Sequence, residues 1–120
     1  MDGHVTFLVE VSVKDGQLDT FEKLMREMVE GTSAEPQTLA YEWYISDDGR
    51  SVYVLEKYAD SDAFLSHVEG FLAKWAGRMM ECVQITRFVV GGDPSPAVRE
   101  ILDGFGATYA RPWGGFSRFS

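Results

Sequence analysis

The sequence is poor in the residues that build disulfides, metal sites and nucleic-acid interfaces. Its 120 residues include one cysteine, two histidines, and 11 Lys and Arg against 19 Asp and Glu, for a formal net charge of −8. A lone Cys82 forms no intrachain disulfide, and His4, His67 and Cys82 lack the spacing of a zinc site. Without clustered Lys and Arg, a nucleic-acid partner is excluded as well. We therefore expect no metal and read Cys82 as a small buried hydrophobe.

Long apolar runs and phosphate-binding loops are also missing. No stretch is long and apolar enough to span a membrane, and no charged leader precedes the first strand, so we expect a cytoplasmic protein without a membrane span. Neither a GxGxxG motif at a strand-to-helix turn nor a Walker loop is present, which argues against dinucleotide and nucleotide-phosphate chemistry. Ser-His-Asp and Cys-His catalysis have no local signature.

The clearest pattern that is present is a β-hairpin. Residues 39–46 (LAYEWYIS) and 51–58 (SVYVLEKY) are rich in aromatic and β-branched residues, and Asp48-Gly49 between them suits a tight turn. Alternation puts Leu39, Tyr41, Trp43 and Ile45 on one face, and Ala40, Glu42 and Tyr44 on the other. In the second strand, Val52, Val54, Glu56 and Tyr58 oppose Tyr53, Leu55 and Lys57. Neither face is cleanly polar, so both sides of the sheet are expected to be at least partly covered.

A strand and a helix precede the hairpin. Residues 4–13 (HVTFLVEVSV) alternate as a first strand, and apolar residues then recur at helical spacing from Leu18 towards Gly31, which suits a helix C-cap. In that stripe Met25 and Met28 are placed to flank a ligand cavity, because thioethers adapt their shape. Ordinary core packing is the simpler explanation of the two methionines.

A second helix and a fourth strand follow the hairpin. Capping side chains at residues 60–62 predict a helix from about Ser61 that bends near Gly70 and stops by Gly77. Residues 82–90 (CVQITRFVV) form the fourth strand. The order βαββαβ is that of an α+β, ferredoxin-like domain, here residues 1–92, with an antiparallel sheet covered on one side by two helices.

The other face of that sheet has no element left to cover it. A second copy meeting it across a twofold axis is the simplest cover, so we predict a homodimer. Residues 93–120 open with a short helix, with Ser95 as N-cap and Pro96 at its first position, and end in an aromatic, acid-free segment. That segment is a lid over a pocket, an arm onto the partner subunit or a packing strap, and the sequence leaves the three open.

His67 is the candidate for chemistry. It follows Phe64 by three residues and precedes Phe71 by four, which places it on the margin of the apolar stripe of the second helix. An imidazole leaning into the space between helix and sheet can exchange a proton near neutral pH. The alternative is a half-buried histidine that only hydrogen-bonds a backbone carbonyl.

The stretches EPQTLAYEWY (35–44) and VYVLEKYADSDAFLSH (52–67) resemble the central signature of the antibiotic biosynthesis monooxygenase (ABM) family. Members tend to show Glu-Pro-Gly before strand two, a Glu-x-aromatic pair ending strand three, and a histidine in helix two. Those places are held here by Glu35-Pro36, by Glu56 and Tyr58, and by His67. Gln37 replaces the usual glycine and Tyr58 a common tryptophan. The resemblance covers about residues 4–92 and implies a dimeric α+β barrel, with a pocket between sheet and helices in each subunit.

The resemblance also implies an activity, the oxidation of a small phenol or quinol by molecular oxygen without a cofactor. His67 is then the base or proton shuttle, Tyr44 or Tyr58 donates its hydroxyl to the substrate oxygen, and Glu56 is placed to orient His67. The substrate-binding candidates are Trp43, Phe64, Phe71 and Met25.

Two alternatives from other classes remain. The first is a small-ligand-binding or structural homodimer without turnover, because this scaffold hosts many functions. The second is haem binding and degradation, as in some relatives. Those relatives use an asparagine together with tryptophan and histidine, and this sequence contains no asparagine.

Overall fold

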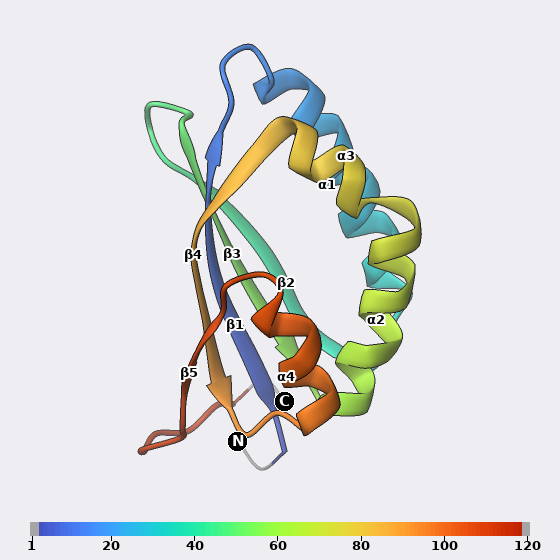
Figure 1. Ribbon diagram of the computed structural model, residues 1–120, viewed down its shortest axis with the longest axis vertical. Helices are drawn as coiled ribbons and strands as arrows, with labels where there is room; N and C mark the ends of the chain where they lie inside the picture. Colours follow the sequence, from blue (N-terminus) through green and yellow to red (C-terminus); the bar gives the residue numbers. More distant parts are fainter. Residues whose placement is uncertain (1–2, 119–120) are drawn as a thin grey trace.

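The computed structural model describes residues 3–118 as one five-stranded sheet with its helices packed against one face (Figure 1). The elements, in chain order, are β1 (Val5–Val13), α1 (Leu18–Ser33), β2 (Thr38–Ile45), β3 (Ser51–Tyr58), α2 (Ser61–Lys74), α3 (Ala76–Cys82), β4 (Val83–Gly92), α4 (Pro96–Asp103) and β5 (Thr108–Ala110). The strands lie in the order β2-β3-β1-β4-β5, antiparallel except for the parallel pair β4 and β5. The predicted ferredoxin-like order is confirmed, with β5 added at one edge.

The core forms where the alternating apolar side chains of β1 meet the helices. Val5, Phe7, Val9 and Val11 are between 0 and 7 % exposed, because β1 is the central strand and all four point to the helix side. The buried stripe of α1 (Phe21, Leu24, Met28 and Thr32) lies against this face. The alternating apolar residues of β1 and the helically spaced apolar residues of α1 are therefore buried against each other in one core layer.

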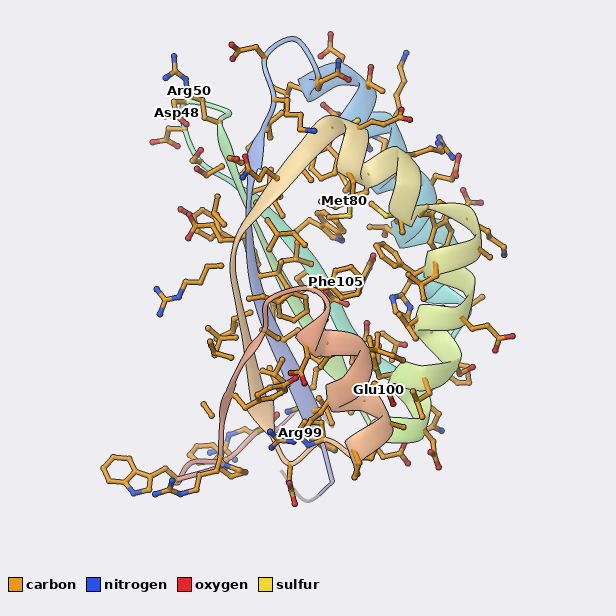
Figure 2. The ribbon with its side chains drawn as sticks, in the orientation of Figure 1. Asp48, Arg50, Met80, Arg99, Glu100 and Phe105 are labelled. Atoms are coloured by element: carbon orange, nitrogen blue, oxygen red, sulfur yellow. The ribbon has the colours of Figure 1, made fainter. Side chains whose placement is uncertain are left out.

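The hairpin between β2 and β3 closes as predicted. Gly49 has a φ of +73°, a conformation that side chains with a Cβ rarely adopt. Asp48 Oδ1 accepts hydrogen bonds from Ser46 Oγ at 2.7 Å and from the Arg50 N–H at 3.0 Å. Asp48 and Arg50 mark the tip of this turn in Figure 2, and Gly49 between them lies close to Leu18 at the start of α1. The turn fixes the register in which Trp43 faces Val54.

The second helical region differs from the sequence prediction. The break falls at Trp75, and not at Gly70, and α3 then continues past Gly77 to Cys82. Trp75 is 6 % exposed and lies against Gly31, which is inside α1 and is not its C-cap. A Cβ on Gly31 would come within 2.6 Å of the Trp75 ring, so this glycine permits close packing of the ring on α1. Cys82 is buried, at the end of α3 and not in a strand.

The first part of the C-terminal segment, through β5, packs on the rest of the protein, and the part after Ala110 projects from it. Ser95 caps α4 by accepting from the Val98 N–H at 3.3 Å, as its sequence predicts. Tyr109 in β5 donates to Asp103 Oδ1 at 2.6 Å, and its ring stacks under Arg99 at 4.2 Å. These contacts tie β5 to α4, while the trace after Ala110 projects from the sheet on the side away from the helices (Figure 1).

The second face of the sheet carries no helix and exposes large apolar side chains. Leu8 is 54 % exposed, Tyr44 57 % and Tyr53 45 %. Among the helices formed by residues 3–118, none combines the length and the apolar character that a membrane crossing requires. The expectation of an uncovered, partly apolar sheet face therefore agrees with the structure.

Candidate active site

A cavity lies between the sheet and helices α2, α3 and α4. Its volume is about 70 Å³, counted as the space that the centre of a water-sized molecule can reach. Its walls are mainly aromatic and aliphatic. Phe7 and Phe88 line it from the sheet and Phe64 from α2, while Met80 on α3 and Phe105 after α4 border it on the helix side (Figure 2). Among the described residues that line the cavity, the ionisable side chains are Tyr41, Glu56 and His67.

His67 is held by a carboxylate from the loop between α1 and β2. Its Nδ1 lies 2.8 Å from Oε1 of Glu35, and the same oxygen accepts from Thr38 Oγ1 at 2.8 Å. The side chain of His67 is 4 % exposed and that of Glu35 31 %. A carboxylate accepts hydrogen bonds, so the proton of a neutral imidazole sits on Nδ1 and the Nε2 lone pair is free to accept another proton.

Glu56 and Tyr58 form a second polar pair beside this histidine. Both point to the helix side of β3, and the Tyr58 hydroxyl donates a short hydrogen bond to Glu56 Oε1. The Tyr58 ring centroid lies 5.3 Å from that of His67. Burial raises the pKa of Glu56, against the opposing effects of the Tyr58 hydrogen bond and of His67. The site therefore places a carboxyl whose pKa is raised beside an imidazole that is held by a different carboxylate.

Burial also keeps the phenols of this site neutral. The pKa values of Tyr41 and Tyr58 are raised, first by burial and then by the negative charge of Glu56. Tyr41 packs edge-on against His67, with centroids 5.7 Å apart. At neutral pH these tyrosines are hydrogen-bond donors and not bases.

The structure brings most of the sequence-predicted site residues to one place. His67, Glu56, Trp43, Phe64 and Phe71 line the cavity. Tyr58 reaches it through its contacts with Glu56 and His67. Phe71 stacks nearly parallel to the imidazole, at 21° and 6.3 Å.

Two predicted residues lie elsewhere. Tyr44 is on the helix-free face, where its hydroxyl donates to Glu42 at 2.7 Å, because strand alternation sends it away from Trp43. Met25 lines a separate groove between α1 and the edge strand β2, and not the cavity that His67 lines. Of the two tyrosines offered as hydroxyl donor, the structure places only Tyr58 beside His67.

One functional candidate was missed by the sequence reasoning. Glu35, and not Glu56, makes the hydrogen bond to the His67 ring. The signal was available, since Glu35-Pro36 belongs to the motif on which the family resemblance rests, but 32 positions separate the two side chains. In the part of the chain described, 3–118, no three His, Cys, Asp or Glu side chains gather closely enough to hold a metal ion.

Comparison with known proteins identifies the family. Residues 4–73, more than half of the chain, match the family described as antibiotic biosynthesis monooxygenase. The chain belongs to the antibiotic biosynthesis monooxygenase family. A comparison with curated proteins gives no match.

Solved structures show the same fold at low sequence identity. MupZ from Pseudomonas fluorescens aligns with a TM-score of 0.84 at 21 % identity, covering 96 % of this chain and 94 % of MupZ. SnoaB, a cofactor-independent oxygenase from Streptomyces nogalater, aligns at 0.65 and 19 % identity over 78 % and 95 % of the two chains. Rv0793 from Mycobacterium tuberculosis aligns at 0.65 and 20 % identity over 78 % and 98 %. The coverage of 96 % means that the likeness to MupZ extends through most of the C-terminal segment.

Proposed function

We propose that this protein is a cofactor-independent monooxygenase that oxidises a small, neutral phenol or quinol with molecular oxygen. The observation that carries the proposal is the Glu35–His67 hydrogen bond at the wall of an aromatic cavity. Membership of the family and the likeness to SnoaB, an oxygenase by name, support the same reaction class. The proposal gives His67 the role of proton acceptor.

The reaction needs a base more than it needs a metal. A phenol that loses its proton to His67 Nε2 becomes an electron-rich anion, which can transfer one electron to O₂. Recombination of the two radicals forms a carbon–oxygen bond, and the proton returns from His67 to give a hydroperoxide. Where the attacked ring carbon carries a hydrogen, loss of water leaves a carbonyl there, so the C–OH and C–H of the phenol and O₂ become the two C=O groups of a quinone and H₂O. Each atom of oxygen is accounted for.

The cavity walls favour a flat, uncharged substrate. Phe64, Phe71 and Trp43 supply ring surfaces from both the helix and the sheet sides. Nε1 of Trp43 is buried and has no hydrogen-bond partner among residues 3–118, so it is available to donate to a substrate oxygen. Glu56 in its protonated form offers a second donor. The described residues that line the cavity include no Lys or Arg, so a phosphate or a carboxylic acid would enter without a counter-charge, which disfavours such substrates.

Oxygen uptake tests the proposal. The purified protein is presented with a panel of anthrols and quinols in an oxygen electrode, beside the variants His67→Ala and Ser66→Ala. We expect uptake by wild type and by the control Ser66→Ala, whose side chain is exposed on the same helix turn, and a loss of about 10²-fold or more in His67→Ala. Tight binding of these compounds without uptake would instead favour the ligand-binding alternative.

The assembly and location form part of the same proposal. We propose a homodimer joined through the helix-free sheet face, where Leu8, Tyr44 and Tyr53 are exposed. We place it in the reducing cytoplasm, where the single thiol of Cys82 stays reduced. Sedimentation velocity of the purified protein checks the dimer.

A further inference from the structure

The most exposed aromatic side chains of the described residues lie together on the C-terminal tail. Trp113 is 97 % exposed and Phe116 78 %. Large rings left in water forgo the burial that stabilises them elsewhere, by about 25 cal/mol for each Å² of apolar surface. Neighbouring exposed rings on one short segment are typical of a surface that is covered by a partner.

The tail runs beside the helix-free face of the sheet. After β5 it leaves the lower end of the sheet on the side away from the helices (Figure 1). Ser117 Oγ then accepts a hydrogen bond from Lys57 Nζ at 3.0 Å, and Lys57 is on the face of β3 that points away from the helices. The tail that carries Trp113 therefore returns at Ser117 to the sheet face that exposes Leu8 and Tyr53.

The charge of the tail is opposite to that of the body. Residues 104–120 contain Arg111 and Arg118 and no acid, so this segment carries +2. The whole chain carries −8, which leaves −10 on residues 1–103. Two such bodies repel each other on approach, and a cationic segment reaching across the contact reduces that repulsion.

We propose that residues 111–118 form an arm that clasps a second copy of this chain, with Trp113 as its anchor on the partner's helix-free sheet face. The proposal rests on the proposed homodimer and adds to it the segment that holds the two copies together. Pro112 restricts the backbone before Trp113, and Gly115, at a φ of +115°, turns the chain back towards Lys57. Trp and Arg are the residue types that most often dominate binding energy at interfaces.

The test compares dimer dissociation constants by sedimentation velocity over a range of protein concentrations. Trp113→Ala is expected to raise the constant at least about tenfold, because it removes a central aromatic anchor. The side chain is 97 % exposed within one copy, so its removal leaves the fold of that copy intact. Leu72→Ala, at a 51 % exposed apolar position on α2, is the matched control and is expected to leave the constant unchanged.

A third variant separates failure of the arm from failure of the dimer. Leu8→Arg places a charge in the middle of the helix-free face and is expected to dissociate the dimer. If Leu8→Arg dissociates it while Trp113→Ala stays within twofold of wild type, the dimer stands and the arm is wrong. If wild type is monomeric at every concentration, both ideas fall.

Tryptophan fluorescence tests independently whether Trp113 contacts a second copy of the chain. The emission difference between wild type and Trp113→Phe isolates Trp113, and we expect it to shift to the blue as protein concentration rises through the dissociation constant. A shift that appears only with anionic phospholipid vesicles, and not with concentration, would make the arm a membrane contact and overturn the proposal.

Discussion

Oε1 of Glu35 lies 2.8 Å from Nδ1 of His67, although one residue belongs to the loop before β2 and the other to the middle of α2. Because this bond holds the proton on Nδ1, Glu35→Gln is expected to weaken the base without emptying the site: the amide can donate to Nδ1 and favour the opposite tautomer. We expect kcat for oxygen uptake to fall about 10- to 100-fold with little change in KM.

The control for this substitution is Glu30→Gln, at an exposed position of α1. It removes the same charge without touching His67 and is expected to leave kcat within twofold of wild type. Nitrogen NMR of the imidazole reads the tautomer directly. An unchanged tautomer in Glu35→Gln would contradict the orienting role of Glu35, whatever the kinetics.

Glu56 makes the stability of the protein depend on pH in a definite direction. Burial raises its pKa above the ordinary 4.5, so the folded state holds this proton more tightly than the unfolded chain does. The stability that this bound proton contributes is fully present below the pKa that Glu56 has in the unfolded chain. It is lost as the pH rises through the higher pKa that Glu56 has in the folded state. Glu56→Gln mimics the protonated form. The free energy of unfolding of wild type, relative to this variant, is therefore expected to fall as pH rises from about 4.5.

Urea unfolding of both proteins at one fixed protein concentration, from pH 4.5 to pH 8, gives that difference. A difference that grows in favour of wild type with rising pH would show that the hydrogen bond from Tyr58 and the charge on His67 outweigh the burial of Glu56.

Tyr58→Phe isolates the contribution of one hydroxyl. Tyr58 is 0 % exposed, and its hydroxyl is the donor to Glu56. Removing it leaves a buried carboxyl oxygen without that partner, which costs about 1–3 kcal/mol of unfolding free energy. Tyr53→Phe, at a 45 % exposed position on the other face of the same strand, is expected to change stability by less than about 0.5 kcal/mol. Equal effects of the two substitutions in urea unfolding would mean that the Glu56 contact adds nothing.

Two glycine-to-alanine changes are expected to act in opposite directions. Both Gly31 and Gly70 are inside helices, where alanine is favoured by about 1 kcal/mol. A Cβ at Gly70 meets nothing within 4 Å, so Gly70→Ala should stabilise by about that amount. At Gly31 the new methyl group would overlap the Trp75 ring, and the overpacking is expected to destabilise by about 1–3 kcal/mol. Thermal unfolding of the two variants measures both effects. Stabilisation by Gly31→Ala would mean that the Trp75 ring can move aside to accommodate the new methyl group.

The parts of the fold that were predictable from sequence are those set by local pattern. Alternation in residues 5–11 and 51–58 grouped the side chains that share a strand face, although it did not say which group meets the helices, and Asp48-Gly49 identified the turn. The position of His67 on the margin of its helix followed from its spacing to Phe64 and Phe71. Each of these depends on residues within one turn or one strand of each other.

The parts that were not predictable depend on contacts between distant segments. The break at Trp75 follows from its packing on Gly31, a contact that no local window of sequence contains. Strand β5 is three residues long, and it pairs parallel to β4 where Tyr109 is also held by Asp103 of α4. The partner of His67 was assigned to Glu56 for the same reason, since proximity between loop and helix emerges only once the sheet is assembled.

The short strand β5 has a consequence for how copies of this protein meet. By occupying hydrogen-bonding groups of β4 at residues 89–91, it blocks that part of one rim of the sheet, where another chain would otherwise add as a further strand. The opposite rim, β2, is interrupted by a register shift between Thr38 and Ala40, which spoils a straight template. Strand addition is thereby hindered at residues 89–91 of one rim and at the register shift of the other, and the homodimer proposed above, joined through the flat of the sheet, uses neither rim.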